Sequence, residues 1–299
     1  MDNIIMLFLC LALGMVLRGL GRMPANTHLG LNAFIINISL PALTLVQIHA
    51  MELRASLAFA VLMPWLLFGI GTLLFGIAGY LAKLPKETTG ALIVVGSLGN
   101  TSFVGLPMIE SFYGANHMPT GIIIDQLGTY LVLSTVGFFV ICLYTQGAVT
   151  FRELMLRIVT FPPLIALAIA IVLLPVTYPP WLTSSLTRLG GTLAPLALVS
   201  VGLQLRMETL RGNRRLLAAG LGYKLLLAPA LIAILYFGIL GLRGQTAQVT
   251  LFESAMAPQI GGSIVAIQYG LNASLITLMV GIGTVISFLT LPAWWYFFQ

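Results

Sequence analysis

Helix-length apolar runs follow one another along this chain, and only short loops separate them. A run of about 20 apolar residues is long enough to cross the hydrocarbon core of a bilayer as a helix. Only 7% of the residues are charged, against about 25% in a soluble domain, so the chain cannot cover a water-facing surface. The runs are also too long for the alternating strands of an outer-membrane barrel. The sequence therefore predicts an all-α integral membrane protein.

Ten spans are predicted from the apolar windows and from the loop signals between them. They cover residues 3–20, 31–49, 56–82, 89–113, 118–145, 154–175, 182–205, 216–240, 246–269 and 273–298. Cytoplasmic loops carry an excess of Lys and Arg, so the basic residues indicate the orientation. With the N-terminus outside, 10 of the 14 Lys and Arg residues fall on the cytoplasmic side, namely Arg18, Arg22, Lys83, Lys86, Arg152, Arg157, Arg206, Arg211, Arg214 and Arg215. Of the others, Arg54, Arg188 and Arg243 fall outside, and Lys224 lies within a span.

The chain is therefore expected to be a multi-pass protein of the plasma membrane, the inner membrane of a bacterium, with both termini outside. The net charge of +6 is explained by these basic loops, and we expect no nucleic-acid partner. The expected surroundings of the chain are the lipid bilayer.

The fourth span, within Thr88–Gly114, has a polar and broken middle. Its centre carries Gly96, Ser97, Gly99, Asn100, Thr101, Ser102, Gly105 and Pro107. An interrupted helix survives in hydrocarbon only where protein or a water-filled cavity covers the free backbone groups, and transporters hold substrates at such gaps. The N–H groups of the following half-helix would favour an anion. The alternative is a helix-packing face made of small and polar residues.

The ninth span is interrupted in the same way. Its middle carries Glu253, followed by Pro258, Gln259, Gly261 and Gly262. Asn100 lies twelve residues from the start of its stretch and Pro258 twelve residues from Thr246, so both are about 18 Å deep at about 1.5 Å per residue. The two breaks are therefore expected to meet near the middle of the bilayer, as crossed, broken helices four and nine.

The two halves of the chain, 1–150 and 151–299, each contain five predicted spans. An odd number of spans turns the second half upside down, which is the inverted-repeat plan of many secondary transporters. Spans two and seven share a similar core around Pro41 and Pro195, and spans four and nine both end in Tyr-Gly. Pro41 is thus a candidate for the substrate site, and a simple proline kink is the equal alternative.

Two acidic residues lie inside predicted spans. Glu253 is about 10 Å below the outer edge, where a charge is costly unless it is paired, protonated or near a cation. Asp125 is buried by the same count, and burial disfavours the charged carboxylate, so either residue could exchange a proton. The alternatives are a neutral, hydrogen-bonded Glu253 and an Asp125 that is the structural partner of Lys224. Lys224 itself is expected to snorkel toward the cytoplasmic face.

Three stretches resemble a known family. They are GNTSFVGLPMIESFYG at 99–114, IDQLGTY at 124–130 and AMAPQIGG at 255–262, and they resemble the auxin efflux carrier family, in its bacterial branch with malate and malonate permeases. The resemblance implies a scaffold domain of spans one, two, six and seven and a transport domain of spans three to five and eight to ten. It also implies elevator-type transport of small organic anions, with Asn100, Pro107 and Pro258 facing the substrate carboxylate. Thr101, Ser102, Gln259 and Gly261 complete the expected substrate site.

The related bile acid:sodium symporters carry a Glu ahead of the break that coordinates sodium, and Glu253 is similar. The coupling ion is therefore expected to be Na⁺ or H⁺ if there is one, and no other cofactor or metal is expected. No nucleophile–base set is visible, so an enzyme is not expected. A channel, the remaining alternative, would need a continuous polar stripe through several spans. Homodimers are common among such carriers and are part of the expectation.

Overall fold

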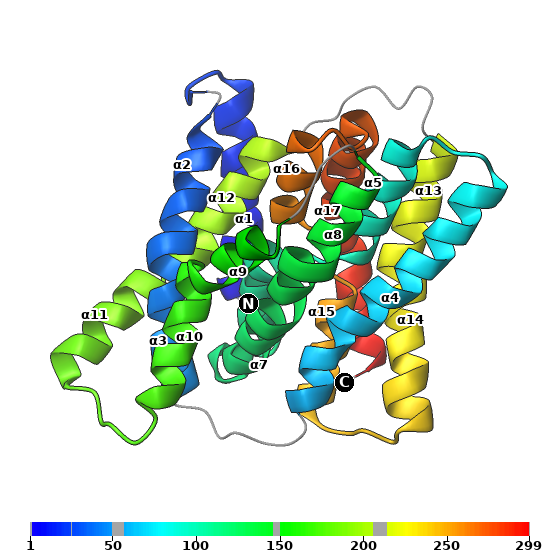
Figure 1. Cartoon of the computed structure of the whole chain (residues 1–299). Helices are drawn as coiled ribbons and strands as arrows, with labels where there is room; N and C mark the ends of the chain where they lie inside the picture. The colour runs from blue at the N-terminus through cyan, green and yellow to red at the C-terminus, as the bar shows by residue number, and fades with distance from the viewer. Residues whose placement is uncertain (1, 25, 50–56, 146–149, 206–213, 299) are drawn as a thin grey trace. The chain divides into compact units, whose positions relative to one another are not determined.

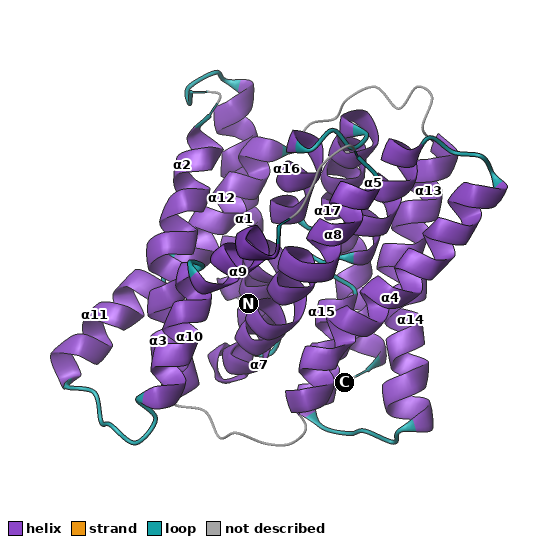
Figure 2. Ribbon diagram, viewed as in Figure 1, coloured by secondary structure: helices purple, strands orange, loops and turns teal. Residues whose placement is uncertain are grey.

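The computed structural model describes residues 2–24, 26–49, 57–145, 150–205 and 214–298. Every regular element in these ranges is helical, and no strand occurs in them (Figure 2). Six helical stretches are long and apolar enough to cross a membrane: Thr27–His49, Leu57–Leu81, Ala115–Leu143, Pro180–Gln204, Arg214–Ile239 and Ala273–Phe297. With a mean hydropathy of +1.04, the chain is an all-helical, multi-pass membrane protein. Arg54, Arg206 and Arg211, which contributed to the predicted orientation, lie outside the described residues.

The chain divides into two compact units, each built from separate segments. The first comprises the described residues of Met1–Ala55, Ser102–Ile122 and Leu156–Leu205. Its elements are α1 (Asp2–Gly19), α2 (Thr27–Phe34), η1 (Ile35–Ser39), α3 (Leu40–His49), α6 (Leu106–Phe112), η3 (Ala115–His117), α10 (Pro162–Val172), α11 (Pro180–Gly190) and α12 (Leu193–Gln204). Three elements cross the unit boundaries: η2 (Thr101–Gly105), α7 (Met118–Ile123) and α9 (Phe151–Val159).

The second unit comprises the described residues of Ser56–Thr101, Ile123–Met155 and Arg206–Gln299. Its elements are α4 (Leu57–Leu81), α5 (Lys86–Ser97), η4 (Ile124–Tyr130), η5 (Leu133–Gly137), α8 (Phe138–Leu143), α13 (Arg214–Gly222), η6 (Tyr223–Leu227), α14 (Ala228–Ile232), η7 (Ala233–Ile239), α15 (Gln245–Ser254), α16 (Ile260–Gln268) and α17 (Ala273–Phe297). Of these, η4, η5, η6 and η7 are π-helical turns within longer helices.

In the first unit, α1 lies against α12 (Figure 1). Two glycines permit this approach, because a Cβ at Gly14 would collide with the carbonyl of Val199, and a Cβ at Gly202 with that of Leu11. Small residues let helices pack closely in a bilayer, where the hydrophobic effect does not drive association. Gly14 and Gly202 therefore lie where these two helices touch.

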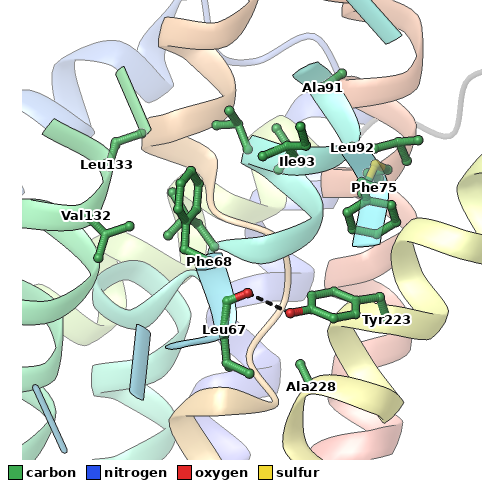
Figure 3. Packing of buried hydrophobic residues seen from close by; sticks show 14 of the residues in the cluster. Leu67, Phe68, Phe75, Ala91, Leu92, Ile93, Val132, Leu133, Tyr223 and Ala228 are labelled. Carbon is green, nitrogen blue, oxygen red and sulfur yellow. Dashed lines mark hydrogen bonds between the residues drawn. The ribbon is translucent and has the colours of Figure 1, made fainter. Parts of the chain in front are cut away.

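The second unit has a buried apolar core to which α4, α5 and η6 contribute (Figure 3). The hydroxyl of Tyr223 donates to the carbonyl of Leu67 at 2.6 Å, and the ring of Tyr223 meets the edge of Phe75 at 5.3 Å between centroids. A buried tyrosine needs such a partner for its hydroxyl. This contact fixes η6 against α4 at the residue that precedes Lys224.

Large apolar side chains cover one face of α4. Leu73, Ile77 and Leu81 are 67%, 59% and 73% exposed. A soluble protein rarely exposes such a patch without an interaction partner. In a membrane protein this face meets lipid.

Candidate functional site

The first interruption follows α5. This helix ends at Ser97, and Leu98 has an extended backbone with φ −93° and ψ 133°. Helical structure resumes at η2 and continues in α6. Glycine, serine and asparagine are poor helix formers, and four such residues lie at 96, 97, 99 and 100, which explains why the helix breaks here.

The second interruption separates α15 from α16. It covers residues 255–259, and Gln259 is extended with φ −69° and ψ 130°. Pro258 cannot donate a backbone hydrogen bond and its ring disfavours a continuing helix, so the sequence places the break immediately before it.

The two interruptions pair with each other through the main chain. Gly99 faces Pro258 in an isolated antiparallel bridge. On either side of it, Asn100 N–H donates to the Ala257 carbonyl at 2.7 Å and Gln259 N–H donates to the Leu98 carbonyl at 3.1 Å. Pro258 occupies a position in this pairing that donates no bond, so its missing N–H costs nothing. The pairing satisfies backbone groups that two broken helices would otherwise leave free in the membrane.

Lys224 lies beside both interruptions. Its Nζ donates to the carbonyl of Ser254 at 2.8 Å, at the C-terminal end of α15, and a Cβ added to Gly99 would lie 3.2 Å from the same Nζ. The side chain is only 1% exposed. The expectation that Lys224 snorkels to the cytoplasmic face is therefore wrong. The unpaired carbonyls and the negative dipole end of α15 attract the ammonium group into the interior.

A proline shapes the helix that carries Lys224. Pro229, in α14, has no N–H for the carbonyl of Leu225 one turn earlier. That carbonyl instead accepts the indole N–H of Trp294 at 3.0 Å, and η6 forms the π-helical turn just before the proline. Such turns change the angle at which side chains leave a helix and are frequent at functional sites.

A small cavity opens beside Lys224 in the second unit. It is lined by Met63, Pro64, Leu67, Ser97, Gly99, Thr101, Thr129, Lys224 and Glu253. Its volume of about 10 Å³ has room for about one water molecule. Among the described residues, the hydroxyls of Ser97 and Thr129 and both carboxyl oxygens of Glu253 are buried without a hydrogen-bond partner. Buried polar atoms of this kind normally bind a water or an ion.

Glu253 lies in the last turn of α15 and is 1% exposed. It interacts electrostatically with Asp125 and with Lys224. A negative charge near the C-terminal end of a helix is opposed by the helix dipole. For the ionised form of Glu253, Asp125 and the C-terminal end of α15 are therefore unfavourable, and Lys224 is favourable.

Asp125 lies in η4 and is buried. Its Oδ1 accepts the hydroxyl of Thr101 at 2.6 Å, which links η4 to the first interruption. The close approach of η4 to α4 depends on Gly128, because a Cβ there would lie 2.7 Å from Cγ of Pro64. Gly128 thus permits the close packing on α4 of the π-helical turn that carries Asp125.

The other predicted residues of the second unit differ in their surroundings. Asn100 is fully buried, and its N–H takes part in the paired interruptions. Gln259 is also buried, and its Oε1 has no hydrogen-bond partner among the residues that the structure describes. Gly261, in the first turn of α16, is exposed and has open space where a side chain would begin. Of these three residues, Gly261 is the exposed one.

The remaining predicted residues, Ser102, Pro107 and Pro41, belong to the first unit. Pro107 lies in the first turn of α6, and the bridge partner of Pro258 is Gly99. Pro41 is the second residue of α3 and is partly exposed. Ser39 beside it shares a 2.7 Å hydrogen bond with Thr192 of the seventh predicted span. At least one of the polar groups near Pro41 thus has a structural partner.

Sequence reasoning missed Lys224, Ser97 and Thr129 as parts of one buried cluster. Lys224 had the clearest signal, because a lysine in the middle of a span needs a partner, and a proline follows five residues later. Ser97 was visible as part of the break. Thr129 carried no signal, since single threonines are common in membrane helices.

Paired helix interruptions with a buried charge cluster, in a polytopic membrane protein, are typical of membrane transport proteins. A family model described as membrane transport protein matches residues 1–295. The chain belongs to this family, the auxin efflux carrier family, and the resemblance identified from the sequence is confirmed.

Two archaeal proteins are similar to the chain over nearly its full length. An uncharacterized transporter of Methanothermobacter thermautotrophicus is 27% identical over 297 residues, which cover 98% of this chain and 96% of that protein. An uncharacterized transporter of Methanocaldococcus jannaschii is 24% identical over 303 residues, covering 98% and 97%. The protein is therefore a membrane transporter.

Proposed function

We propose that the protein is a secondary transporter of small organic anions, carboxylates in particular, that works by elevator-type alternating access. The observation that carries this proposal is the pairing of the two helix interruptions. Unwound backbone at mid-membrane is where secondary transporters bind substrates, and it persists only where protein covers it or a cavity admits water. Membership of the transport family supports the transport function.

The proposed architecture has ten spans in two inverted five-helix repeats, with scaffold spans one, two, six and seven and a transport domain of the others. α5 and α15 both end in an interruption, and a shorter helix follows each, α6 and α16. The antiparallel bridge between the interruptions supports segments that run in opposite directions. Both termini lie outside the plasma membrane in this proposal.

The anionic character of the substrate is supported by the first turn of α16. The first N–H groups of a helix lack intrahelical partners, and the positive end of its dipole favours a carboxylate. Gly261 leaves these groups accessible, because it is exposed with open space beside it. Gln259 precedes this turn and offers a side-chain amide. The other residues kept in the proposed substrate path are Asn100, Thr101, Ser102, Pro107, Pro258 and Pro41.

The test is uptake of radiolabelled malonate, malate and lactate into proteoliposomes by the wild type and by Gly261→Val. The valine side chain would fill open space beside the N–H groups without meeting another atom within 4 Å at its Cβ. We expect saturable wild-type uptake of at least one acid, and a fall of about tenfold or more in kcat/KM for the variant. Loss of one hydrogen bond to a charged group costs about 1.5–3 kcal/mol, and about 1.4 kcal/mol corresponds to tenfold.

The matched control is Gly69→Val in α4, since Gly69 is also exposed with open space around it. Its uptake should equal that of the wild type. Equal uptake by the Gly261→Val variant would remove the first turn of α16 from the site. Unsaturable currents would assign a channel, and wild-type protein that transports none of the three acids would contradict the substrate class.

A further inference from the structure

Three charged residues form a buried cluster in the second unit: Lys224, Asp125 and Glu253. They are 1%, 3% and 1% exposed. A net charge in a membrane interior is costly, and several kcal/mol are lost for each ion that is not compensated. The cluster is therefore most stable when its charges sum to zero, and this condition sets the number of protons that it holds at rest.

Lys224 contributes the positive charge. Its ammonium donates to the Ser254 carbonyl at the negative end of α15 and lies against the backbone of Gly99. The hydrogen bond to Ser254 and the negative end of α15 stabilise the charged form. A cation is thus already built into the place where the two interruptions meet.

Asp125 contributes the compensating negative charge. The Thr101 hydroxyl donates to its Oδ1 at 2.6 Å, and a hydrogen bond donated to a carboxylate stabilises its ionised form. With Asp125 ionised and Lys224 charged, the cluster is neutral before Glu253 is considered.

Glu253 would add a second negative charge if it were ionised. Neither of its oxygens accepts a hydrogen bond from any residue that the structure describes, and the helix end opposes its charge. The elements packed most closely against α15 are α4, α14, α17 and η7. Their titratable side chains are three tyrosines, Tyr80, Tyr236 and Tyr296. Lys224 and Asp125 are therefore the charges that act on Glu253.

We propose that Glu253 carries one exchangeable proton, and that Lys224 is a resident cation that stands in place of a bound sodium ion at the paired interruptions. The inference rests on the proposed function for its role in coupling. Release breaks the O–H bond of Glu253, transfers H⁺ to a water molecule and leaves one negative charge on the carboxylate. Rebinding reverses these steps, so one proton crosses with each substrate molecule.

The cavity favours a proton over a metal cation. Lys224 lines it together with Glu253, so a sodium ion would meet the ammonium charge in a space of about 10 Å³. A proton removes a charge from this space and needs no further ligands. The hydroxyls of Ser97 and Thr129 line the same cavity and can hold the one water molecule that accepts the proton.

The first test is an infrared pH titration of the purified full-length protein in lipid, without any substrate. We expect a carboxylic acid C=O stretching band in the wild type that disappears as the pH is raised. Glu253→Gln, which keeps the shape of the side chain, should lose this band at every pH. Glu87→Gln in α5, whose carboxyl is exposed, is the matched control and should keep it. Persistence of the band in Glu253→Gln would overturn the proposal.

The same spectra test whether sodium binds at this site and whether Lys224 compensates the charge of Asp125. Replacing potassium chloride by sodium chloride should leave the wild-type band unchanged, and loss of the band in sodium would assign a cation site instead. Lys224→Met should add a second carboxylic acid band of similar intensity, because Asp125 loses its compensating charge and takes up a proton. Lys86→Met, at an exposed lysine, should add none. An unchanged spectrum in Lys224→Met would contradict the assigned charge balance.

The transport assay separates this inference from the proposed function. With an acid that the wild type carries, Glu253→Gln should retain exchange of external for internal acid and lose accumulation driven by a pH gradient. Loss of both, or gradient-driven accumulation that persists, would contradict proton coupling through Glu253. A wild type that transports no acid but shows the infrared behaviour would refute the proposed substrate class and leave the proton site standing.

Discussion

At the scale of single residues, Gly128 determines how closely η4 approaches α4. A Cβ there would lie 2.7 Å from Cγ of Pro64 and 3.2 Å from the carbonyl oxygen of Val61. We expect Gly128→Ala to lower the free energy of unfolding by about 1–3 kcal/mol, the usual cost of overpacking, measured as the thermal unfolding midpoint in detergent. Gly69→Ala, with no atom within 4 Å, is the control. Equal midpoints would show that η4 can move away from α4.

The charged residues show how far sequence reasoning reaches at this scale. Asp125 and Glu253 could be predicted as buried, because each lies within a long apolar run and no short side chain can reach the interface. Lys224 could not be placed, since a lysine has a stem long enough to reach either the membrane surface or the interior. Its direction depends on the Ser254 carbonyl, which becomes available only when α15 ends beside it.

At the scale of helical elements, the contact of Trp294 with the Leu225 carbonyl supports the π-helical turn η6. We expect Trp294→Phe to lower the free energy of unfolding by about 1–3 kcal/mol, because the buried Leu225 carbonyl loses a donor that takes the place of the missing N–H of Pro229. The measurement is again the thermal midpoint, and Trp181→Phe, at a tryptophan that is 69% exposed, is the control. A variant as stable as this control would mean that the carbonyl has another donor.

The position of each interruption could be predicted from the local sequence. For their pairing, the sequence predicted only that the two interruptions lie close together. Glycine, asparagine and proline disfavour a helix wherever they cluster, so the breaks near 97–100 and 255–259 follow from propensity. The identity of the bridge partners, Gly99 and Pro258, depends on the register of two helices that are remote in sequence. Residue counting at 1.5 Å per residue is too coarse to resolve that register.

At the scale of the whole molecule, the prediction of a polytopic helical protein is confirmed, and the number of spans shows why helix length alone is a limited criterion. Six predicted spans are long apolar helices. Spans one and six correspond to shorter apolar helices, Ile5–Gly19 and Pro162–Val172, and spans four and nine are the interrupted ones. Because spans four and nine are interrupted, a criterion of helix length does not find them, although they carry the candidate site. The inverted repeat stays a prediction.

The predicted orientation can be tested on the same scale. Lys86 and Gln245 are both exposed, at the starts of α5 and α15, and the bias of basic residues places position 86 in the cytoplasm and position 245 outside. We expect Gln245→Cys to react with a membrane-impermeant maleimide on intact cells, and Lys86→Cys to react only after permeabilisation. The background should carry serine at Cys10 and Cys142, which are buried. The reverse pattern would invert the topology, and with it the side from which α15 enters the membrane toward Glu253. Labelling of both positions on intact cells would contradict the placement of α5 and α15 on opposite sides, on which the inverted repeat depends.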